Sequence, residues 1–465
     1  SQNTDDIQLH LKVPTTFGKI GSVNPRPSSL KTSGDFHLLD FAKSDLSLFG
    51  IHMVFGHYQT FDFKILYELN NPSSEVQTEK IALPPDTNYQ EIYYESLTPK
   101  PKNVELDEDG NWLALYEIPS SSKIHIEAVG KAVIFSQPQK KFPIKPIDTD
   151  SYTQAEKYWE TDNPEIVTWA QKLKTPKNIY DYVVKTLSYD YDQIDSKITR
   201  KGAVFALTDS SKVLCSEFTD LFVALARAAG IPAREVEGYA YNDNPKINFL
   251  SSGSDILHSW PEFYDRQKNE WLMIDPTFGN TSGGLDFFNQ FDTAHFAFVI
   301  HGKKSDFPYP AGSFKENFSD KQIFVNFGQD FVKNDSPALS VENILPKSLF
   351  TLKATTVYFE IKNSSGYAVN NKKLSLANSG DIFPKEWQIE TIPPFGSIKI
   401  VTSFKPKETF SDYTLKSSLT DGDNTIFFGQ NLVSSSLRLL IIAGVGISII
   451  IVAILISLRK QIINK

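Results

Sequence analysis

The most restrictive feature of this sequence is an uncharged apolar run close to its C-terminal end. From Leu439 to Leu458 the chain reads LLIIAGVGISIIIVAILISL, twenty residues without a charge. At a rise of about 1.5 Å per residue, a helix of this length matches the roughly 30 Å hydrocarbon core of a bilayer. A buried helix of a globular domain would keep a polar stripe, which this run lacks. The run therefore predicts one transmembrane helix over residues 439–458.

Basic residues beside this run predict its orientation. Arg459, Lys460 and Lys465 follow it directly, and such clusters tend to stay on the cytoplasmic side. We therefore expect a cytoplasmic tail over residues 459–465 and an extracellular body before the helix, although Arg438 lies on the outer flank. The sequence opens at Ser1 without an apolar leader, so the expectation is a removed signal peptide, with truncation of the chain as the alternative.

The body in front of the run is acidic and contains a single cysteine. The formal net charge is −8, and residues 424–465 carry four basic and no acidic residues, which leaves −12 for the rest. This acidity argues against nucleic acid as a partner, because phosphate binding relies on Lys and Arg. One cysteine excludes an internal disulfide, so stability must come from packing. Four sequons are compatible with an exterior location, at Asn280, Asn317, Asn334 and Asn363.

Periodicity predicts a chain dominated by β structure. Short apolar runs rich in Phe and Tyr are bounded by Pro, Asn, Asp and Gly. In FDFKILYEL, residues 61–69, every second side chain is large and apolar, which is typical of a strand with one buried face. DEDGNW, residues 107–112, has its glycine misplaced for a calcium loop, so its Asp-Gly predicts a hairpin turn.

Between about residues 155 and 305 the periodicity becomes helical. Asn163-Pro164 and Thr175-Pro176 have the order of an N-cap followed by the first helical residue. At 465 residues the chain is too long for one core, and we expect a multidomain, β-rich architecture with an α+β core between two β-sandwiches. The predicted segments are a loosely ordered lead-in (1–35), an N-terminal β-sandwich (36–137), a linker (138–154), the α+β core (155–305), a linker (306–321), a C-terminal β-sandwich (322–433), the transmembrane helix (439–458) and the tail (459–465).

The only cysteine lies at the start of a predicted helix. An apolar stripe follows Cys215 at helical spacing and ends at Gly230 and Pro232. A helix N-terminus carries about half a positive charge and free N–H groups, which favour a thiolate. Taken alone, a lone buried cysteine is more often a small apolar core residue, so the helix position by itself does not assign a function.

A histidine and an aspartate share a predicted hairpin further along the chain. Residues 255–280 read as strand, turn and strand around DRQKN. With the turn centred between Arg266 and Gln267, His258 stands opposite Asp275, with Cβ atoms about 4.5–5.5 Å apart. The alternative is a structural His–Asp pair at a hairpin base. A thiol, an imidazole that takes its proton and a carboxylate that orients the imidazole are the groups that nucleophilic catalysis requires.

These segments resemble the transglutaminase-like cysteine enzymes, whose core is similar to that of papain-like proteases. The similar segments within about residues 155–305 are Cys215 with its helix, ALARAAGIPAREVEGYAY (224–241), HSWPEFY (258–264) and WLMIDPTFG (271–279), and HFAFVIHG (295–302) resembles the strand that closes such a core. The resemblance implies Cys215 as nucleophile, His258 as general base and acid, and Asp275 as the orienting acid. It also implies accessory domains of Ig-like type.

Two positions depart from the family's pattern. The family commonly has glycine close before its cysteine, whereas Lys212, Val213 and Leu214 precede Cys215 here. Pro261 interrupts the strand of His258 and removes a backbone donor, which predicts an edge strand.

The resemblance implies acyl transfer, deamidation or hydrolysis of amide bonds through a thioester on Cys215. Trp260, Tyr189 and Tyr191 are candidates for a second oxyanion donor beside the Cys215 N–H, and each is more readily explained as a packing residue. The eight histidines are scattered around a single cysteine, so we expect no metal site and no cofactor. The expected partners are protein or peptide substrates at the cell surface and the membrane itself.

Two other functions remain open at this point. The same three residues would serve a membrane-tethered cysteine protease, which only its products would distinguish. The fold could also be a catalytically silent cell-surface scaffold, in which Cys215 would react no faster than free cysteine.

Overall fold

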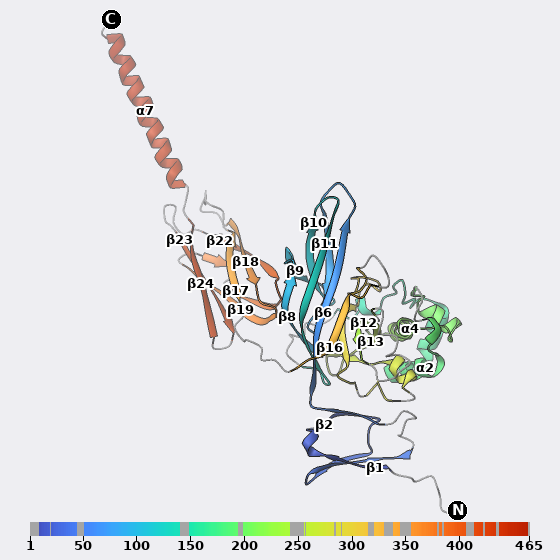
Figure 1. Cartoon of the computed structure of the whole chain (residues 1–465). Helices are drawn as coiled ribbons and strands as arrows, with labels where there is room; N and C mark the ends of the chain where they lie inside the picture. The colour runs from blue at the N-terminus through green and yellow to red at the C-terminus, as the bar shows by residue number, and fades with distance from the viewer. Residues whose placement is uncertain are drawn as a thin grey trace, which may run out of the picture. The chain divides into compact units, whose positions relative to one another are not determined.

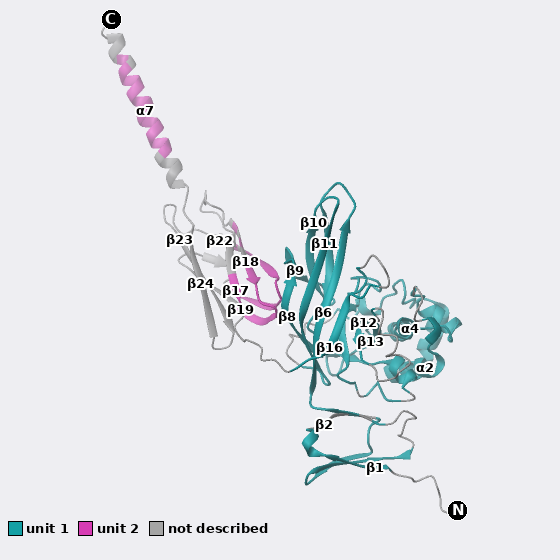
Figure 2. Cartoon of the chain, in the orientation of Figure 1, with its two compact units in different colours: residues 1–333 teal, residues 334–465 magenta. Residues whose placement is uncertain are grey.

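The computed structural model forms two compact units, residues 1–333 and 334–465 (Figures 1 and 2). The sequons Asn317 and Asn334 lie outside the described residues. The structure describes the chain except for residues 1–8, 19, 44–50, 140–147, 194–198, 242–254, 256, 283–284, 290, 315–319, 330–337, 345–354, 379–380, 384–385, 406–412, 422–423, 434–436 and 464–465.

The N-terminal part of the first unit consists of two small antiparallel sheets. One has the strand order β1-β4-β3 and the other pairs β2 with β5. Leu39 and Phe41 are fully buried between them. The prediction of a loosely ordered lead-in is therefore wrong for residues 9–33, because a few apolar side chains in this polar stretch suffice to pack against Leu39 and Phe41. The elements are β1 (Leu9–Pro14), a 3-10 turn (Thr15–Phe17), β2 (Ile20–Asn24), β3 (Ser29–Ser33), β4 (Phe36–Phe41) and β5 (His52–Phe55).

A sandwich of two antiparallel sheets follows, and Tyr94 packs against Trp112 between them. The sheets have the orders β16-β6-β11-β8 and β7-β10-β9. The predicted alternation is confirmed in β6, where Phe61, Phe63, Ile65 and Tyr67 are buried. The strands are β6 (Tyr58–Asn71), β7 (Gln77–Leu83), β8 (Gln90–Thr98), β9 (Asn103–Leu106), β10 (Trp112–Ile118), β11 (Ser122–Phe135) and β16 (Ile323–Phe327).

Strand β16 is not part of the C-terminal sandwich that the sequence predicts from residue 322. It pairs with β6, with Ile323 opposite Ile65. Alternating apolar residues predict a strand and its buried face, but they do not specify the neighbouring strand. The first sandwich is therefore completed by a segment that follows the α+β core in the sequence.

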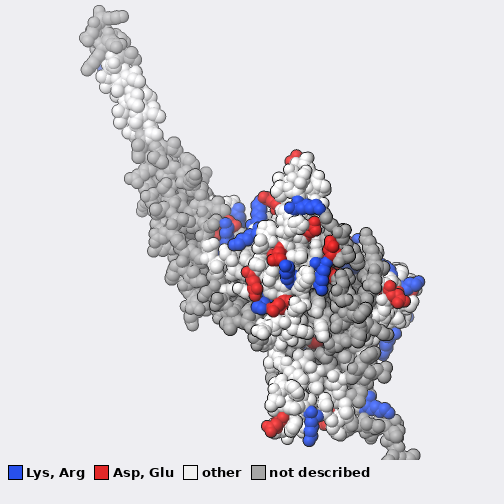
Figure 3. Space-filling view, in the orientation of Figure 1, with Lys and Arg blue, Asp and Glu red and all other residues white. Residues whose placement is uncertain are grey.

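Charged side chains are interspersed over this part of the surface. On the face in Figure 3, Lys and Arg side chains lie among Asp and Glu side chains of the described residues. The strands of the sandwich also carry exposed ion pairs, such as Lys64 with Glu127 at 2.6 Å and Lys80 with Glu105 at 2.7 Å. The described part of this face therefore has no continuous basic strip of the kind that binds phosphate backbones.

The α+β core places a four-stranded antiparallel sheet against helix α4. The sheet order is β14-β13-β12-β15, and α4 is enclosed by α1, α2, α3 and the sheet in one apolar cluster. The elements are a 3-10 turn (Ser151–Thr153), α1 (Pro164–Leu173), α2 (Pro176–Thr186), a second 3-10 turn (Tyr191–Gln193), α3 (Ala203–Thr208), α4 (Cys215–Ala228), β12 (Ala233–Ala240), β13 (His258–Asp265), β14 (Glu270–Met273), α6 (Pro276–Thr281) and β15 (His295–His301).

The predicted helix starts are confirmed. The Asn163 side chain accepts the Glu165 N–H at 2.9 Å, and the Thr175 side chain accepts the Asn178 N–H at 3.2 Å. These bonds satisfy donors that the first helical turn leaves without partners. Local capping chemistry therefore fixes where α1 and α2 begin.

Strand β13 is an inner strand, so the edge position predicted from Pro261 is wrong. It pairs with β12 on one side and with β14 on the other. In an antiparallel strand the N–H and C=O of one residue point to the same side, and the Pro261 carbonyl accepts the Ile274 N–H at 3.2 Å. The backbone nitrogen of Pro261, which has no hydrogen to donate, therefore faces the segment just after Met273, where β14 has ended.

Two buried carboxamides from the sandwich bind the outer edge of β15. The Gln90 side chain accepts the Ala297 N–H at 2.8 Å and donates to the Ala297 carbonyl at 2.9 Å. Asn111 binds Ile300 in the same way, at 2.7 Å and 2.8 Å. Each amide replaces the backbone of a neighbouring strand, so the edge of the core sheet is satisfied without another strand.

Asn111 belongs to the DEDGNW segment, for which the sequence predicts a hairpin turn. The prediction is confirmed, since residues 107–111 connect β9 to β10. The Asp107 carboxylate accepts the N–H groups of Asp109 and Asn111, and Asp109 accepts those of Gly302 and Lys303 at 3.0 Å. The turn therefore also joins the sandwich to the end of β15.

The second unit contains two four-stranded antiparallel sheets in the region predicted as a C-terminal sandwich. Their orders are β17-β18-β22-β20 and β21-β19-β23-β24. Buried apolar residues include Ile361, Val369, Ile389 and Ile392. The strands are β17 (Leu339–Ile344), β18 (Thr355–Asn363), β19 (Val369–Asn378), β20 (Asp381–Phe383), β21 (Glu386–Ile392), β22 (Ser397–Lys405), β23 (Tyr413–Asp421) and β24 (Asn424–Val433).

Helix α7 (Leu437–Ile463) contains the apolar run. The structure describes its side chains at residues 443–457 and 459, and apolar ones such as Ile449 and Leu455 are exposed. Within the part of the chain that the structure describes, no helix has the length and apolar character of a membrane span. The transmembrane helix over residues 439–458 remains a prediction.

We predict that Asn111→Ala destabilises the first unit by about 2–4 kcal/mol, because the N–H and C=O of Ile300 would stay buried without partners. Urea unfolding of the full chain, followed by tryptophan fluorescence, measures this, since five of the six tryptophans lie in the first unit. The control is Asn70→Ala at an exposed position of β6, which should change the stability by less than about 0.5 kcal/mol. Equal effects of both substitutions would contradict the proposed role of the amide.

Candidate active site

Cys215 is the first residue of α4, and its thiol is half-buried. The Glu217 carboxylate fixes this helix start, since it accepts the Leu214 N–H and the Lys201 N–H, each at 2.9 Å. On the other side, the Val213 carbonyl accepts the Asp190 N–H at 3.0 Å. The backbone before the thiol is therefore held by bonds to two separate segments, and the helix start lies where the sequence predicts it.

His258 and Asp275 are in direct contact. The Nε2 atom of His258 lies 2.8 Å from Oδ2 of Asp275. His258 is the first residue of β13 and is 9% exposed, and Asp275 is fully buried as the N-cap of α6. The other carboxylate oxygen, Oδ1, accepts the Phe278 N–H at 2.9 Å. Helix α6 therefore fixes the carboxylate that faces the imidazole.

The route to this contact differs from the predicted cross-strand pairing. In the structure Glu262 stands opposite Met273 and Asp265 opposite Glu270, so the turn is centred one residue later than predicted. Asn269, in the left-handed conformation with φ 57°, completes a four-residue turn. Asp275 lies beyond the end of β14 and reaches His258 because the chain turns there into α6.

Charge pairing in this buried site shifts two pKa values in opposite directions. Burial opposes the charged form of His258, but the carboxylate of Asp275, its hydrogen bond to His258 and the nearby Cys215 thiol outweigh burial and raise the pKa of His258 to about 9. Burial alone would raise the pKa of Asp275, whereas His258 and His295 lower it to about 2. At neutral pH the pair is therefore an imidazolium and a carboxylate.

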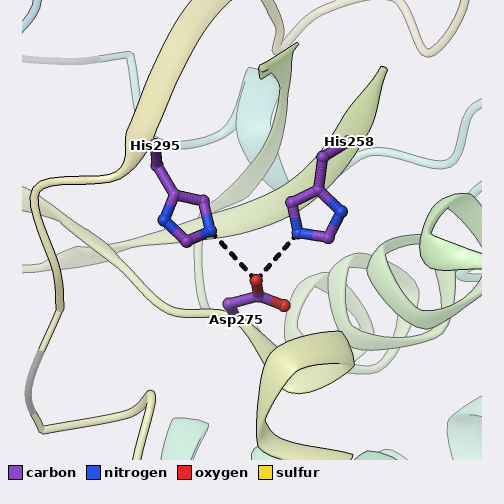
Figure 4. Close-up of side chains that lie close together, drawn as sticks. All are labelled: His258, Asp275 and His295. Carbon is purple, nitrogen blue, oxygen red and sulfur yellow. Dashed lines mark hydrogen bonds and ion pairs between the residues drawn. The ribbon is translucent and has the colours of Figure 1, made fainter. Parts of the chain in front are cut away.

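A second histidine binds the same carboxylate oxygen, and sequence reasoning assigned it no role. The Nε2 atom of His295 lies 3.1 Å from Oδ2 of Asp275, and its Nδ1 lies 2.7 Å from Oδ1 of Asp292. Figure 4 shows the rings of His258 and His295 converging on Asp275 from two strands. The only signals in the sequence are that His295 opens the segment HFAFVIHG and that Asp292 lies three residues before it.

Aromatic rings enclose the two imidazoles. Phe278 stacks on His258 with ring centroids 4.6 Å apart, and Phe291 lies 4.4 Å from His295. Trp260 contacts both rings, at 5.9 Å and 5.0 Å. These rings limit water around the carboxylate, which strengthens its electrostatic interaction with both imidazoles.

The three candidate oxyanion donors lie in different places. The backbone of Tyr189 bridges that of Val213, two residues before Cys215. Burial, and after it the nearby Cys215 thiol, raise the pKa of the Tyr189 phenol. Tyr191 packs on Tyr189 at 5.0 Å. Trp260 is fully buried against the two imidazoles, and its indole N–H has no partner within the described structure. Tyr189 is thus the candidate that the structure brings to the thiol.

His258, Asp275 and His295 form a group of the kind that can bind a metal ion, although the sequence predicts no metal site. Their potential ligand atoms lie within 4.8 Å of one another, and all three side chains are buried. Hydrogen bonds to Asp275 at 2.8 Å and 3.1 Å use a proton on each Nε2, whereas metal ligation requires these atoms unprotonated. The expectation that the chain has no metal site stays a prediction.

Comparison with curated proteins relates the core to known ones. The chain is 36% identical over 73 residues to a protein-glutamine gamma-glutamyltransferase of Pseudomonas aeruginosa, which covers 16% of this chain and 11% of that protein. It is 26% identical over 240 residues to YebA, an uncharacterized protein of Bacillus subtilis. This match covers 45% of this chain and 32% of that protein. The chain therefore spans about a tenth and about a third of the lengths of these relatives.

Solved structures and a family model give a further comparison. The periplasmic domain of TgpA from Pseudomonas aeruginosa is 16% identical, with 48% of this chain and 88% of that chain covered and a TM-score of 0.27. A candidate cysteine protease from Cytophaga hutchinsonii is 19% identical, with 59% and 99% covered and a TM-score of 0.35. Residues 164–276 match the model of the transglutaminase-like superfamily, so the segment that contains Cys215, His258 and Asp275 is a transglutaminase-like domain.

Proposed function

We propose that this protein is a thiol enzyme that acts on amide bonds of proteins or peptides through a thioester on Cys215. The observation that carries the proposal is the 2.8 Å contact between His258 and Asp275, and the Cys215 thiol is close enough to His258 to contribute to its raised pKa. The match of residues 164–276 to the transglutaminase-like superfamily supports it. Cys215 is the nucleophile, His258 the general acid and base, and Asp275 the residue that orients His258.

The first half of the reaction forms the thioester. The Cys215 sulfur attacks the amide carbonyl carbon, which forms a C–S bond and places negative charge on the carbonyl oxygen. The N–H of Cys215, at the first position of α4, has no acceptor within the helix and can bind that oxygen. His258 donates its proton to the nitrogen as the C–N bond breaks, and ammonia or an amine departs.

The second half returns the enzyme to its starting state. His258, now neutral, takes a proton from water or from a lysine amine, which attacks the thioester carbon. The C–S bond breaks, and Cys215 leaves as a thiolate. Water gives deamidation or hydrolysis, whereas an amine gives an isopeptide bond. Asp275 keeps its negative charge throughout and stabilises the His258 imidazolium, which loses its proton in the first half-reaction and is restored in the second.

We further propose that the body faces the cell exterior and is tied to the membrane by residues 439–458. Support comes from the uncharged run and from the basic residues that follow it. The sequons that the structure describes add no support. The Asn280 amide donates to the carbonyls of Val184 and Leu187, and the Asn363 amide is buried and donates to three carbonyls.

Incubation of the full chain with a glutamine-containing peptide and a primary amine tests the reaction. We expect mass spectrometry to detect an amine adduct or a deamidated peptide, and Cys215→Ala to abolish both because no other thiol exists in the chain. A cleaved peptide would indicate a protease instead. If Cys215 reacts with iodoacetamide at pH 6.5 no faster than free cysteine and no product forms, the silent-scaffold alternative would replace this proposal.

Asp275→Asn should lower kcat/KM about 10³-fold, because an amide no longer stabilises the imidazolium of His258. The asparagine oxygen can still cap α6, so the fold should be retained. Steady-state kinetics and circular dichroism measure the two effects. The matched control is Asp162→Asn, an exposed residue before α1, which should keep kcat/KM within about twofold. An Asp275→Asn variant with wild-type kinetics would contradict the assigned role.

The reaction should have a descending limb at high pH. The pKa of His258 is raised to about 9, so the imidazolium persists below that pH and loses its proton as the pH rises through it. Because amide cleavage needs that proton, kcat/KM should fall about tenfold per pH unit above about pH 9. A pH–rate profile with an amide substrate measures this, and a rate that stays constant up to pH 10.5 would contradict it.

Membrane attachment predicts that the full chain, expressed in cells, stays in the membrane fraction after alkaline carbonate extraction. A variant without residues 437–463 should move to the soluble fraction. Protease added to intact cells should digest the body if it faces outward. Full extraction of the intact chain, or protection of its body, would contradict the proposed attachment or orientation, respectively.

A further inference from the structure

Both ring nitrogens of His295 face a carboxylate oxygen. Nδ1 lies 2.7 Å from Asp292 and Nε2 lies 3.1 Å from Asp275. A neutral imidazole has a proton on one nitrogen only, so one lone pair would point at a carboxylate oxygen. The ring satisfies both contacts only as an imidazolium. The His295 side chain is fully buried, so these two acids take the place of its hydration.

His295 therefore places a positive charge beside the pair formed by His258 and Asp275. The same oxygen of Asp275 accepts from both imidazoles, and the two rings are 5.6 Å apart. Two cations thus share one carboxylate oxygen. The raised pKa of His295, at about 9, agrees with the charged form and arises from Asp292 and Asp275 acting against burial.

We propose that His295 is a positioning residue of the thiol site, which holds Asp275 in place from the side opposite His258 and, as a buried cation, limits how strongly Asp275 retains the proton on His258. This inference rests on the proposed function of Cys215 and His258. Without that cation, Asp275 would stabilise the His258 imidazolium further, and the general acid would give up its proton less readily.

The other groups around His295 make this assignment specific. Among the described residues, the titratable groups in contact with it are Asp275 before α6, Asp292 before β15 and His258 on β13. The remaining neighbours are the uncharged rings of Trp260, Phe278 and Phe291. The charge of His295 therefore acts on Asp292, Asp275 and His258, and of these Asp275 and His258 belong to the thiol site.

The backbone around His295 is fixed independently of the site. Gly238 of β12 pairs with His258 on one side and with Ala297 of β15 on the other. A side chain at Gly238 would collide with the Phe296 carbonyl, so glycine permits the close approach of β15. The Gln90 amide binds Ala297 from the opposite edge. Ala297, two residues after His295, is therefore bound by β12 on one side and by Gln90 on the other, which fixes the start of β15.

His295→Gln tests the inference, because glutamine keeps one N–H donor for Asp275 and removes the positive charge. The rate of Cys215 alkylation by iodoacetamide is measured against pH in the full chain. Loss of the His258 proton gives the high-pH step of that profile, and removing a cation about 5–6 Å away should move this step up by about one pH unit. His295→Ala, which also removes the donor, should lower kcat/KM about 10–100-fold.

His301→Gln is the matched control. This buried histidine lies at the other end of β15 and is held by Glu235 at 2.9 Å and by the Pro308 carbonyl at 2.8 Å. Its replacement should lower the melting temperature to a similar extent and leave the alkylation profile unchanged. A purely structural role of His295 predicts the same pattern for both variants.

The outcomes separate this inference from the proposed function. A profile of His295→Gln within about 0.2 pH units of an activated wild type would overturn the role of His295 alone, as would an equal shift in His301→Gln. Wild-type Cys215 that reacts as free cysteine does, with no step from His258, would overturn the thiol site and with it this inference. Absence of amide products from an activated wild-type thiol would overturn only the proposed reaction.

Discussion

The carboxylate of Asp275 is the interaction on which the site depends. One oxygen caps α6 through the Phe278 N–H, and the other accepts from His258 and His295. A fully buried carboxylate is costly unless hydrogen bonds and opposite charge compensate it, and here both do. The same three bonds that pay this cost orient the imidazole beside Cys215, so the stability and the chemistry of the site have one origin.

The surrounding fold holds these groups in place through elements that are far apart in the sequence. Strand β13 brings His258, the turn into α6 brings Asp275, and β15 brings His295. The amides of Gln90 and Asn111 satisfy the outer edge of β15 from the first sandwich. The sandwich is therefore part of the support of the site, because without it the strand of His295 would have a free edge.

Local features of the fold could be read from the sequence. Asn163 and Thr175 cap the helices that they were predicted to cap, and α4 begins at Cys215. The proximity of His258 and Asp275 was predicted as well, but with a register that differs from the observed one. The pairing of β16 with β6 and the inner position of β13 were not predicted, because a period of two residues gives the buried face of a strand and not its neighbours.

The sequence by itself determined the types of group available: one thiol at a helix start, a histidine and an aspartate on either side of a short turn, and an uncharged run near the C-terminal end. Each depends on residues close together in the chain, where capping and periodicity act. Only the tertiary structure decided that His295 joins Asp275, since strand order and the turn into α6 bring together residues that no local pattern relates. The packing of the strands around a buried carboxylate determines which side chains can bind it.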